Sequence, residues 1–502
     1  MIKSYGILLP VFSLPGGHGI GDFGSSVYDF VNLLSKVKCA YWQILPLNPG
    51  TTENGYSPYF STSAYAINPL YISLDMLHND GLLTRNELAE IPETPVENID
   101  YDKVRTLKMP LLTRAAHRFH PDDHYFEFCK MNQHWLNDYA MFEVLRYTTK
   151  KPWTDWDAVV RDREQSTIDN LNNIHKEAIH VQKVLQYFAM IQWKKLLAYC
   201  TEKGISIIGD MPIYVALDST ETWIDPQLFK LDNNKQPVAV SGVPPDYFSA
   251  TGQLWNNPVY NWNEHKRNGF TWWIQRMRHL FSLYHIVRID HFRGLVQYWE
   301  IPAGKPTAID GAWRDVPTYD LFDILRDTFT NFPVICEDLG IITDDVKEAI
   351  QHYSFPGMKV LQFAFGDDTL DNPYLPVNYD DNCIVYTGTH DNLPTLGWLE
   401  SEATTQELQR IQNYSGFTSD NPVEIVWKLI EMALESKASV AIIPLQDILT
   451  LGVTARINNP AKLHGNWQWR WDDAAYPAVD AFSRLFAMSE RAGRLQIGRA
   501  HV

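Results

Sequence analysis

The stretch from Ile286 to Gly294 reads IVRIDHFRG, and the fold of the chain can be worked out from it. Ile286, Val287 and Ile289 have the apolar, β-branched character of a buried strand, but charged residues follow them directly. Burying charged groups at the end of a strand costs free energy, so they are unusual there unless the protein uses them. The pattern therefore predicts that Asp290 lies where a buried strand passes into a functional loop.

The same change from apolar to acidic residues recurs twice downstream. In PVICEDLG, Glu337 and Asp338 follow an apolar run, and in CIVYTGTHDN, His390 and Asp391 follow another. In a β/α barrel the carboxyl ends of the strands meet at one rim, and the active site is built there. Three strands that each end in a carboxylate therefore favour a barrel active site.

The chain contains eight strand-like runs, and from the third onward helical patterns such as 344–352 and 422–436 separate them. Eight strands alternating with helices predict an α/β protein with a (β/α)8 TIM barrel. A doubly wound sheet with a helical domain is the alternative. The predicted strands are Tyr5–Phe12, Ala40–Leu47, Ile205–Tyr214, His285–Ile289, Pro333–Cys336, Met358–Phe365, Cys383–Thr387 and Ser439–Pro444.

Large insertions are expected in a single catalytic barrel spanning 1–496, because a plain barrel needs only ~250 residues. A helical insertion is expected at about 72–200, and a proline-rich, loop-rich insertion that serves the active site at about 218–273. Residues 497–502 resemble a translated sequencing adapter and are expected to be a non-native tail. Apolar residues at helical spacing in the first insertion are Trp135, Tyr139, Phe142, Leu145, Val181, Val184, Phe188 and Ile191.

Composition and charge restrict the possible partners. The net charge of −17 argues against nucleic acid or an anionic membrane, since both are polyanions. The five cysteines are scattered without a CxxC pair, which indicates reduced thiols and a cytoplasmic protein. No apolar run is long enough to span a membrane. The 17 Trp and 25 Tyr fit either a surface that stacks on sugar rings or a large aromatic core.

Paired carboxylates on a rigid rim suit cleavage of a glycosidic bond and require neither metal nor cofactor. Asp290 is the better candidate for the nucleophile, because Arg288 and Arg293 flank it and positive charge keeps a carboxylate ionised. Glu337 is the better acid, because the apolar residues before it should desolvate it and raise its pKa. Asp391 and the histidine before it could hold sugar hydroxyls.

These segments carry a resemblance to a known family. RIDHFRG, CEDLG and TGTHDN resemble the catalytic strand ends of the α-amylase superfamily. GVPPDYFSATGQLWNNPVYNW resembles the long active-site loop of the amylomaltases, the 4-α-glucanotransferases of glycoside hydrolase family 77. Further matches include SLPGGHGIGDFG, GYSPYFSTSAYAINPLYI, GDMPIYV, PGMKVLQFAF, RINNP and NWQWR, so the resemblance covers nearly the whole chain.

The resemblance implies a retaining double displacement that moves α-1,4-glucan segments to the 4-hydroxyl of glucose or a maltooligosaccharide. It implies that Asp290 is the nucleophile, Glu337 the general acid/base and Asp391 the residue that stabilises the transition state. It also implies a set of substrate-binding residues. Arg288, His390 and Tyr59 would contact the reacting sugar, and Asp246, Phe248, Gln253 and Trp255 would cover the acceptor side.

The chain departs from the family pattern near the expected site. Asn256 replaces the usual glycine before Asn-Pro, Leu393-Pro394 replaces a small polar pair, and Ala461 replaces another glycine. None of these changes removes a catalytic group. Two other functions stay open at this point: a hydrolase that uses the same carboxylates with water as acceptor, and a non-catalytic glucan-binding protein.

Overall fold

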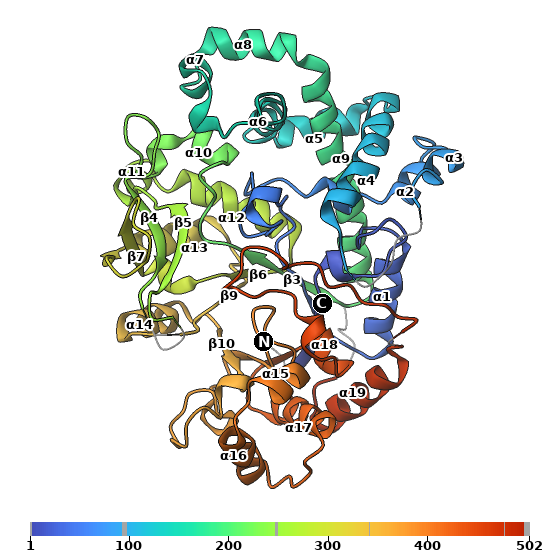
Figure 1. Cartoon of the computed structure of the whole chain (residues 1–502), viewed down its shortest axis with the longest axis vertical. Helices are drawn as coiled ribbons and strands as arrows, with labels where there is room; N and C mark the ends of the chain where they lie inside the picture. The colour runs from blue at the N-terminus through green and yellow to red at the C-terminus, as the bar shows by residue number, and fades with distance from the viewer. Residues whose placement is uncertain (1–2, 93–97, 246–248, 341, 476, 496–502) are drawn as a thin grey trace.

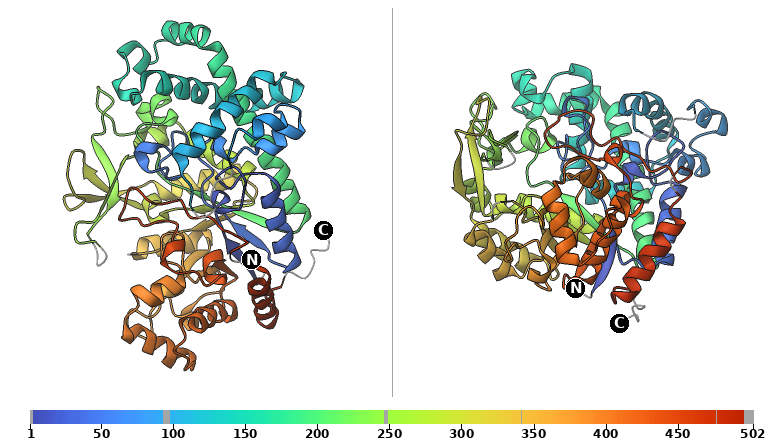
Figure 2. Two further views of the ribbon diagram at one scale, coloured as in Figure 1. Left: turned by 45° about the vertical axis from the view of Figure 1, so that its right-hand side comes forward. Right: turned by 60° about the horizontal axis from the view of Figure 1, so that its bottom comes forward.

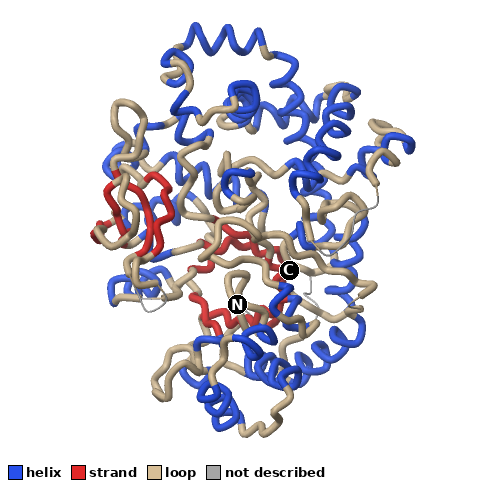
Figure 3. Tube along the Cα trace, in the orientation of Figure 1, coloured by secondary structure: helices blue, strands red, loops and turns tan. Residues whose placement is uncertain are grey.

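The structure is a computed structural model that describes residues 3–92, 98–245, 249–340, 342–475 and 477–495. At its centre, eight parallel strands of the described chain form a barrel in the order β10-β11-β12-β1-β2-β3-β6-β9 (Figure 3). The strands are β1 (Ser4–Leu8), β2 (Tyr41–Gln43), β3 (Ser206–Met211), β6 (Ile286–Ile289), β9 (Val334–Cys336), β10 (Gly357–Val360), β11 (Cys383–Tyr386) and β12 (Val440–Pro444).

The barrel closes between β9 and β10. The amide of Cys336 donates to the carbonyl of Pro356 at 2.9 Å, and the amide of Met358 donates to the carboxylate of Asp338 at 2.6 Å. Each observed strand lies almost entirely within one of the predicted runs, because strands of a parallel barrel are buried on both faces and read as continuous apolar segments. The predicted (β/α)8 barrel is therefore confirmed.

Helices cover the outside of the barrel, with one exception among the described residues (Figure 1). Between β10 and β11 only the short 3-10 turns Leu361–Phe363 and Pro376–Asn378 occur, so the expected helical separation of the later strands is wrong there. The intervening sequence is rich in Asp, Asn and Pro, which favour turns over helix. The surrounding helices are α1 (Ser25–Lys36), α9 (Lys176–Glu202), α12 (Thr271–Leu283), α13 (Thr318–Thr328), α14 (Asp344–Tyr353), α15 (Thr395–Ser401), α16 (Thr405–Ser415), α17 (Pro422–Glu435), α18 (Leu445–Ile448) and α19 (Val479–Arg491).

A group of helices between β2 and β3 projects from one side of the barrel (Figures 1 and 2). Tyr139, Phe142 and Val184 of the predicted apolar stripes are buried here. Treating 72–200 as one insertion stays a prediction. The helices are α2 (Leu74–Asn79), α3 (Arg85–Leu88), α4 (Tyr101–Arg118), α5 (Asp123–Met131), α6 (Leu136–Thr149), α7 (Ala158–Arg161), α8 (Gln165–Ile174) and the long α9.

Two buried glutamines connect α9 to the loop that follows β2. Gln186 accepts from the amide of Ile67 and donates to its carbonyl, both at 2.9 Å. Gln192 does the same with Ser73, at 2.7 and 3.2 Å. Because a side-chain amide can satisfy both polar groups of one residue, these pairs satisfy backbone that would otherwise be buried without partners. They fix the loop that carries Tyr59.

A second, antiparallel sheet of order β5-β4-β7-β8 stands beside the barrel (Figures 1 and 3). Part of it comes from 218–273, which was expected to be mostly loop. The rest comes from the connection between β6 and α13, where the sequence had predicted no strands. The elements are α10 (Thr220–Ile224), β4 (Ala239–Val243), β5 (Gln253–Pro258), α11 (Trp262–Arg267), β7 (Gln297–Pro302) and β8 (Ala312–Asp315).

Arg494, just after α19, is fully buried and fastens the end of the described chain to the barrel. Its guanidinium donates to the carbonyls of Ser4 at 2.8 Å, Ser436 at 3.0 Å and Ala438 at 2.8 Å. Burial lowers the pKa of Arg494 to about 10. The predicted adapter tail, 497–502, lies outside the described residues.

Arg494→Met should lower the apparent Tm because it leaves these buried carbonyls unsatisfied, a loss of about 2–4 kcal/mol. Deletion of 497–502 should leave Tm and activity unchanged. Differential scanning calorimetry of both variants measures the effect. A tail deletion as destabilising as Arg494→Met would contradict the interpretation of the tail as non-native.

Candidate active site

A cavity of about 810 Å³ opens at the carboxyl ends of the barrel strands. It brings together eight of the ten predicted site residues, while Asp246 and Phe248 lie outside the described residues. Because these side chains come from loops after four different strands and from β5 and β6, only the closed barrel makes them neighbours. The eight are Tyr59, Gln253, Trp255, Arg288, Asp290, Glu337, His390 and Asp391.

Arg288 is a buried cation that links two strands at the base of this cavity. It lies beside Asp210 in the register of β3 and β6, and its Nη1 donates to both oxygens of Asp210 at 2.8 and 2.9 Å. The same nitrogen donates to Oδ1 of Asp290 at 2.9 Å. A buried guanidinium requires such partners, because an unpaired buried charge costs several kcal/mol. Arg288 therefore fixes the position of the Asp290 carboxylate.

The charge on Asp290 is set by opposing effects. Burial raises the pKa of Asp290, Arg288 lowers it, and the nearby carboxylates of Asp210 and Glu337 raise it further. The expectation that Arg293 also helps is wrong. Arg293 instead donates to Thr343 and stacks over an indole ring. The contact with Arg288 therefore favours the ionised form of Asp290.

Glu337 follows β9 and is held by backbone amides. The amide of His291 donates to its Oε2 at 2.7 Å, and the amide of Leu339 donates to Oε1 at 2.9 Å. His291 has a φ of 50°, the left-handed conformation that non-glycine residues seldom adopt, and this conformation turns its N–H toward Glu337. Burial raises the pKa of Glu337 despite these amides and the Arg288 charge, as the sequence predicted.

The surroundings of the two carboxyl groups differ in their hydrogen-bond donors. Burial raises the pKa of both Asp290 and Glu337. Arg288 donates directly to Asp290, whereas backbone amides donate to Glu337. Because a cation favours the charged form more strongly than a neutral donor does, the contact with Arg288 favours the charged form of Asp290.

Tyr59, His390 and Asp391 form the opposite wall. Tyr59 donates its hydroxyl to Oδ2 of Asp210 at 2.6 Å, so it must accept from Nε2 of His390, 2.9 Å away. The two rings stack with centroids 5.4 Å apart. Nε2 of His390 also lies 3.4 Å from Asp391. Burial lowers the pKa of His390, so the wall offers a neutral imidazole with a defined tautomer.

Two residues from late in the chain complete the surroundings of Asp391. Asn458 donates to its Oδ1 at 2.6 Å, and Arg456 donates to its backbone carbonyl at 2.9 Å. The loop that carries Asp391 is held from below by buried Asp447, which accepts from the amide and hydroxyl of Thr395 at 2.6 and 2.7 Å. The carboxylate of Asp391 is thus oriented while its side chain stays 43% exposed to the cavity.

The remaining wall comes from β5. Trp255 meets the ring of His291 edge-on, with centroids 4.8 Å apart, and donates to Oε1 of Gln253 at 3.1 Å.

Asn256, which replaces the family's glycine, has a φ of 63°. Asparagine tolerates this left-handed conformation better than most residues, so the backbone that glycine would favour is retained.

Asp210, Asn458 and Trp467 were not predicted as site residues. Asp210 lies within an apolar run that continues beyond it, and a carboxylate inside a buried strand is a signal that could have found it. Asn458 and Trp467 lie in RINNP and NWQWR, far from any barrel strand, and only their place in the fold brings them to the cavity. Trp467 packs near Tyr59, with ring centroids 5.6 Å apart.

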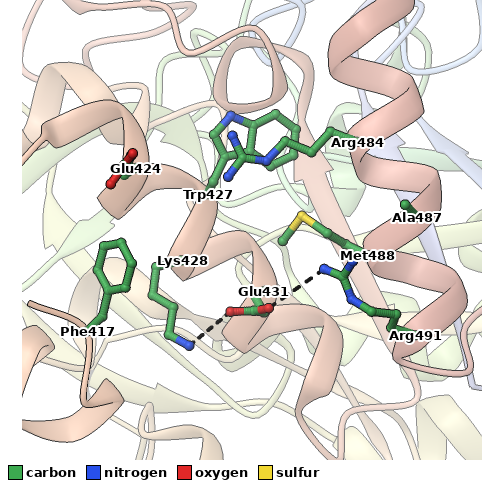
Figure 4. Close-up of a pocket in the computed structure, with 9 residues that line it drawn as sticks. All are labelled: Phe417, Glu424, Trp427, Lys428, Glu431, Arg484, Ala487, Met488 and Arg491. Carbon is green, nitrogen blue, oxygen red and sulfur yellow. Dashed lines mark hydrogen bonds and ion pairs between the residues drawn. The ribbon is translucent and has the colours of Figure 1, made fainter. Parts of the chain in front are cut away.

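A second cavity of about 370 Å³ lies between α17 and α19 (Figure 4). Glu431 faces Lys428 at 2.9 Å and Arg491 at 3.9 Å, and the Arg484 guanidinium lies 4.3 Å from the Trp427 ring centre. Its cations are thus occupied by the protein's own groups. Because none of the predicted catalytic carboxylates lines it, we assign the chemistry to the cavity at the barrel rim.

The described residues contain no group of three His, Cys, Asp or Glu side chains placed to hold a metal ion. Among the helices of the described ranges, none is both long and apolar enough to cross a membrane.

An eight-stranded barrel with paired carboxylates at its rim defines a class, the barrel enzymes that act on glycosidic bonds. Comparison with known proteins gives the family. A family model described as 4-alpha-glucanotransferase, glycoside hydrolase family 77, matches residues 9–475. The chain belongs to this family, and its activity is that of a 4-alpha-glucanotransferase.

Individual relatives agree with this assignment. The chain is 43% identical over 490 residues to the 4-alpha-glucanotransferase of Streptococcus pneumoniae serotype 4, covering 95% of each protein. It is 41% identical over 505 residues to that of Thermus thermophilus, covering 98% of this chain and 99% of the relative. The solved amylomaltase of Streptococcus agalactiae in complex with acarbose is 36% identical, with a TM-score of 0.94 and coverage of 98% and 100%.

Arg288→Lys should move the acidic limb of the kcat/KM pH profile to higher pH. As the predicted nucleophile, Asp290 must be ionised, and a lysine cannot donate to Asp210 and Asp290 with the same fixed geometry. The pKa of Asp290 then rises further, so activity is lost at a higher pH as the pH falls, by about one pH unit. An unmoved acidic limb would show that Arg288 does not control the charge of Asp290.

Proposed function

We propose that the enzyme transfers an α-1,4-glucan segment from one maltooligosaccharide to the 4-hydroxyl of glucose or another glucan by double displacement with retention. Asp290 attacks the anomeric carbon while Glu337 protonates the departing glycosidic oxygen, and a glycosyl ester forms on Asp290. Glu337 then removes the proton from the acceptor 4-hydroxyl, which attacks the anomeric carbon and releases Asp290. One observation supports this assignment: Arg288 donates to the carboxylate of Asp290, while backbone amides donate to that of Glu337.

The wall formed by Tyr59, His390 and Asp391 is proposed to bind the sugar at which the bond breaks. Its neutral imidazole and oriented carboxylate can hydrogen-bond sugar hydroxyls. Positive charge develops on the sugar ring in the transition state, and the carboxylate of Asp391 favours that charge. Tyr59 offers its aromatic ring as an apolar surface beneath the sugar, while its hydroxyl stays fixed by Asp210.

The wall that includes Gln253 and Trp255 is proposed to bind the acceptor, together with Asp246 and Phe248. Leaving sugar and acceptor must both lie next to the acid/base, and Trp255 packs on His291, whose amide binds Glu337. Water at ~55 M competes for the glycosyl ester, so transfer requires an acceptor held in the reactive position. The amylomaltase of Streptococcus agalactiae was solved with acarbose, which supports a carbohydrate ligand for this cavity.

The experiment is incubation of the purified protein with maltotriose. A transferase converts it into glucose and a ladder of longer maltooligosaccharides, whereas a hydrolase only shortens it. Asp290→Asn and Glu337→Gln should each fold normally and lose about three or more orders of magnitude in transfer, because nucleophile and acid/base act as a unit. Chromatography of the products measures both results.

Asp338→Asn is the matched control. Asp338 also follows β9, but it closes the barrel through the Met358 amide and does not line the cavity. An asparagine retains an oxygen that can accept from this amide, so most activity should remain. Shortened products alone, or catalytic variants as active as this control, would overturn the proposed function.

A further inference from the structure

The hairpin of β7 and β8 brings a pair of tryptophans to the edge of the cavity. Trp299 and Trp313 are direct cross-strand partners, with ring centroids 5.2 Å apart and planes at 68°. Trp313 lines the cavity, and Trp299, on the same face of the hairpin, donates to the carbonyl of Ala308 at 2.8 Å. Trp299 thus supports Trp313 from within the antiparallel sheet.

The hairpin restricts the position of the Trp299 side chain. A Cβ atom added to Gly311 would lie 2.2 Å from Nε1 of Trp299, so the indole rests directly on the glycine backbone. Only glycine allows this close approach. Trp299 therefore occupies a fixed position, and the ring of Trp313 packed against it is held in place before any ligand binds. Such preorganisation lowers the entropic cost of binding.

Arg293 holds Trp313 from a second direction. Its guanidinium lies 3.9 Å from the centre of the Trp313 ring, and its Nη1 donates to Oγ1 of Thr343 at 2.9 Å. A guanidinium stacked on an indole is an energetically favourable contact. Since Arg293 also lines the cavity, an aromatic surface and a fixed set of donors lie side by side there.

The position of the acid/base, Glu337, favours a place on the acceptor side for Trp313 and Arg293. The departing sugar and the acceptor both lie next to the acid/base, Glu337. Arg293 is two residues beyond His291, whose amide binds Glu337, and Trp255 packs on the ring of His291. Trp255, Arg293 and Trp313 line the same cavity as Glu337, so a glucan that extends from Glu337 along this cavity can reach Trp313.

We propose that Trp313 is a stacking platform for a distal sugar of the acceptor, and that it determines the preference for acceptor length. The inference rests on the proposed function. Its ligand is an α-1,4-glucan of three or more glucose units. The apolar face of a pyranose stacks on the indole, and Arg293 donates to its hydroxyls. Glucose is too short to reach this platform, so it binds only beside Glu337 and Trp255.

The test compares two radiolabelled acceptors, glucose and maltotetraose, with unlabelled amylose as donor. KM and kcat are measured for each acceptor from the labelled products that exceed it in length. Trp313→Ala should raise KM for maltotetraose about tenfold, the effect of losing one aromatic stacking contact. It should leave KM for glucose and kcat with either acceptor nearly unchanged.

Two variants serve as controls. Trp313→Phe keeps an aromatic face and should restore most of the affinity for maltotetraose. Tyr319→Ala removes an exposed aromatic ring of α13 that does not line the cavity and should change neither KM. If Trp313→Ala raises KM equally for both acceptors, or for neither, the proposal that Trp313 is a stacking platform is overturned. A wild-type enzyme that extends neither acceptor would instead overturn the proposed function itself.

Discussion

The buried guanidinium of Arg288 is the constraint on which the active site depends. It lies inside the barrel, where an unpaired charge would cost several kcal/mol, and the bonds to Asp210 and Asp290 stabilise it there. Those bonds require β3 and β6 to be neighbours in the observed register. The same bonds orient Asp290 and favour its charged form, as its proposed role of nucleophile requires. One interaction thus stabilises the base of the barrel and supports the proposed division of roles between Asp290 and Glu337.

Other walls of the cavity come from segments that lie outside the barrel strands. The antiparallel sheet contributes Trp255 and Trp313, and a late loop contributes Asn458 and Trp467. Three non-glycine residues of the cavity wall, Asn256, His291 and Trp467, have left-handed backbone. Such conformations cost about 1–3 kcal/mol each and persist where surrounding structure determines them. At His291 the consequence is direct, because the strained turn presents an amide to Glu337.

The sequence predicted the barrel well, because buried parallel strands are continuous apolar runs and because a carboxylate at the end of such a run is unusual. Asp290 and Glu337 were found in this way. Asp210 was missed because apolar residues continue beyond it, so it read as strand interior. The expectation that the positive charge of Arg293 also acts on Asp290 was wrong, because Arg293 donates to Thr343 and stacks on Trp313, and neither partner is close to it in sequence. The strands β7 and β8 were missed although they pair with each other as a hairpin, because their few apolar residues are interspersed with polar and charged ones and form no continuous apolar run.

The central claim is that Asp290 carries the glycosyl group between donor and acceptor. The most direct test treats Glu337→Gln with α-maltosyl fluoride, whose leaving group needs no general acid, and analyses the digested protein by mass spectrometry. Without a general base the second step is slow, so the ester should accumulate. The account predicts a maltosyl adduct on Asp290 within the peptide 286–294, released when maltotriose is added. An adduct on another residue, or turnover of the fluoride with inversion and no adduct, would contradict it.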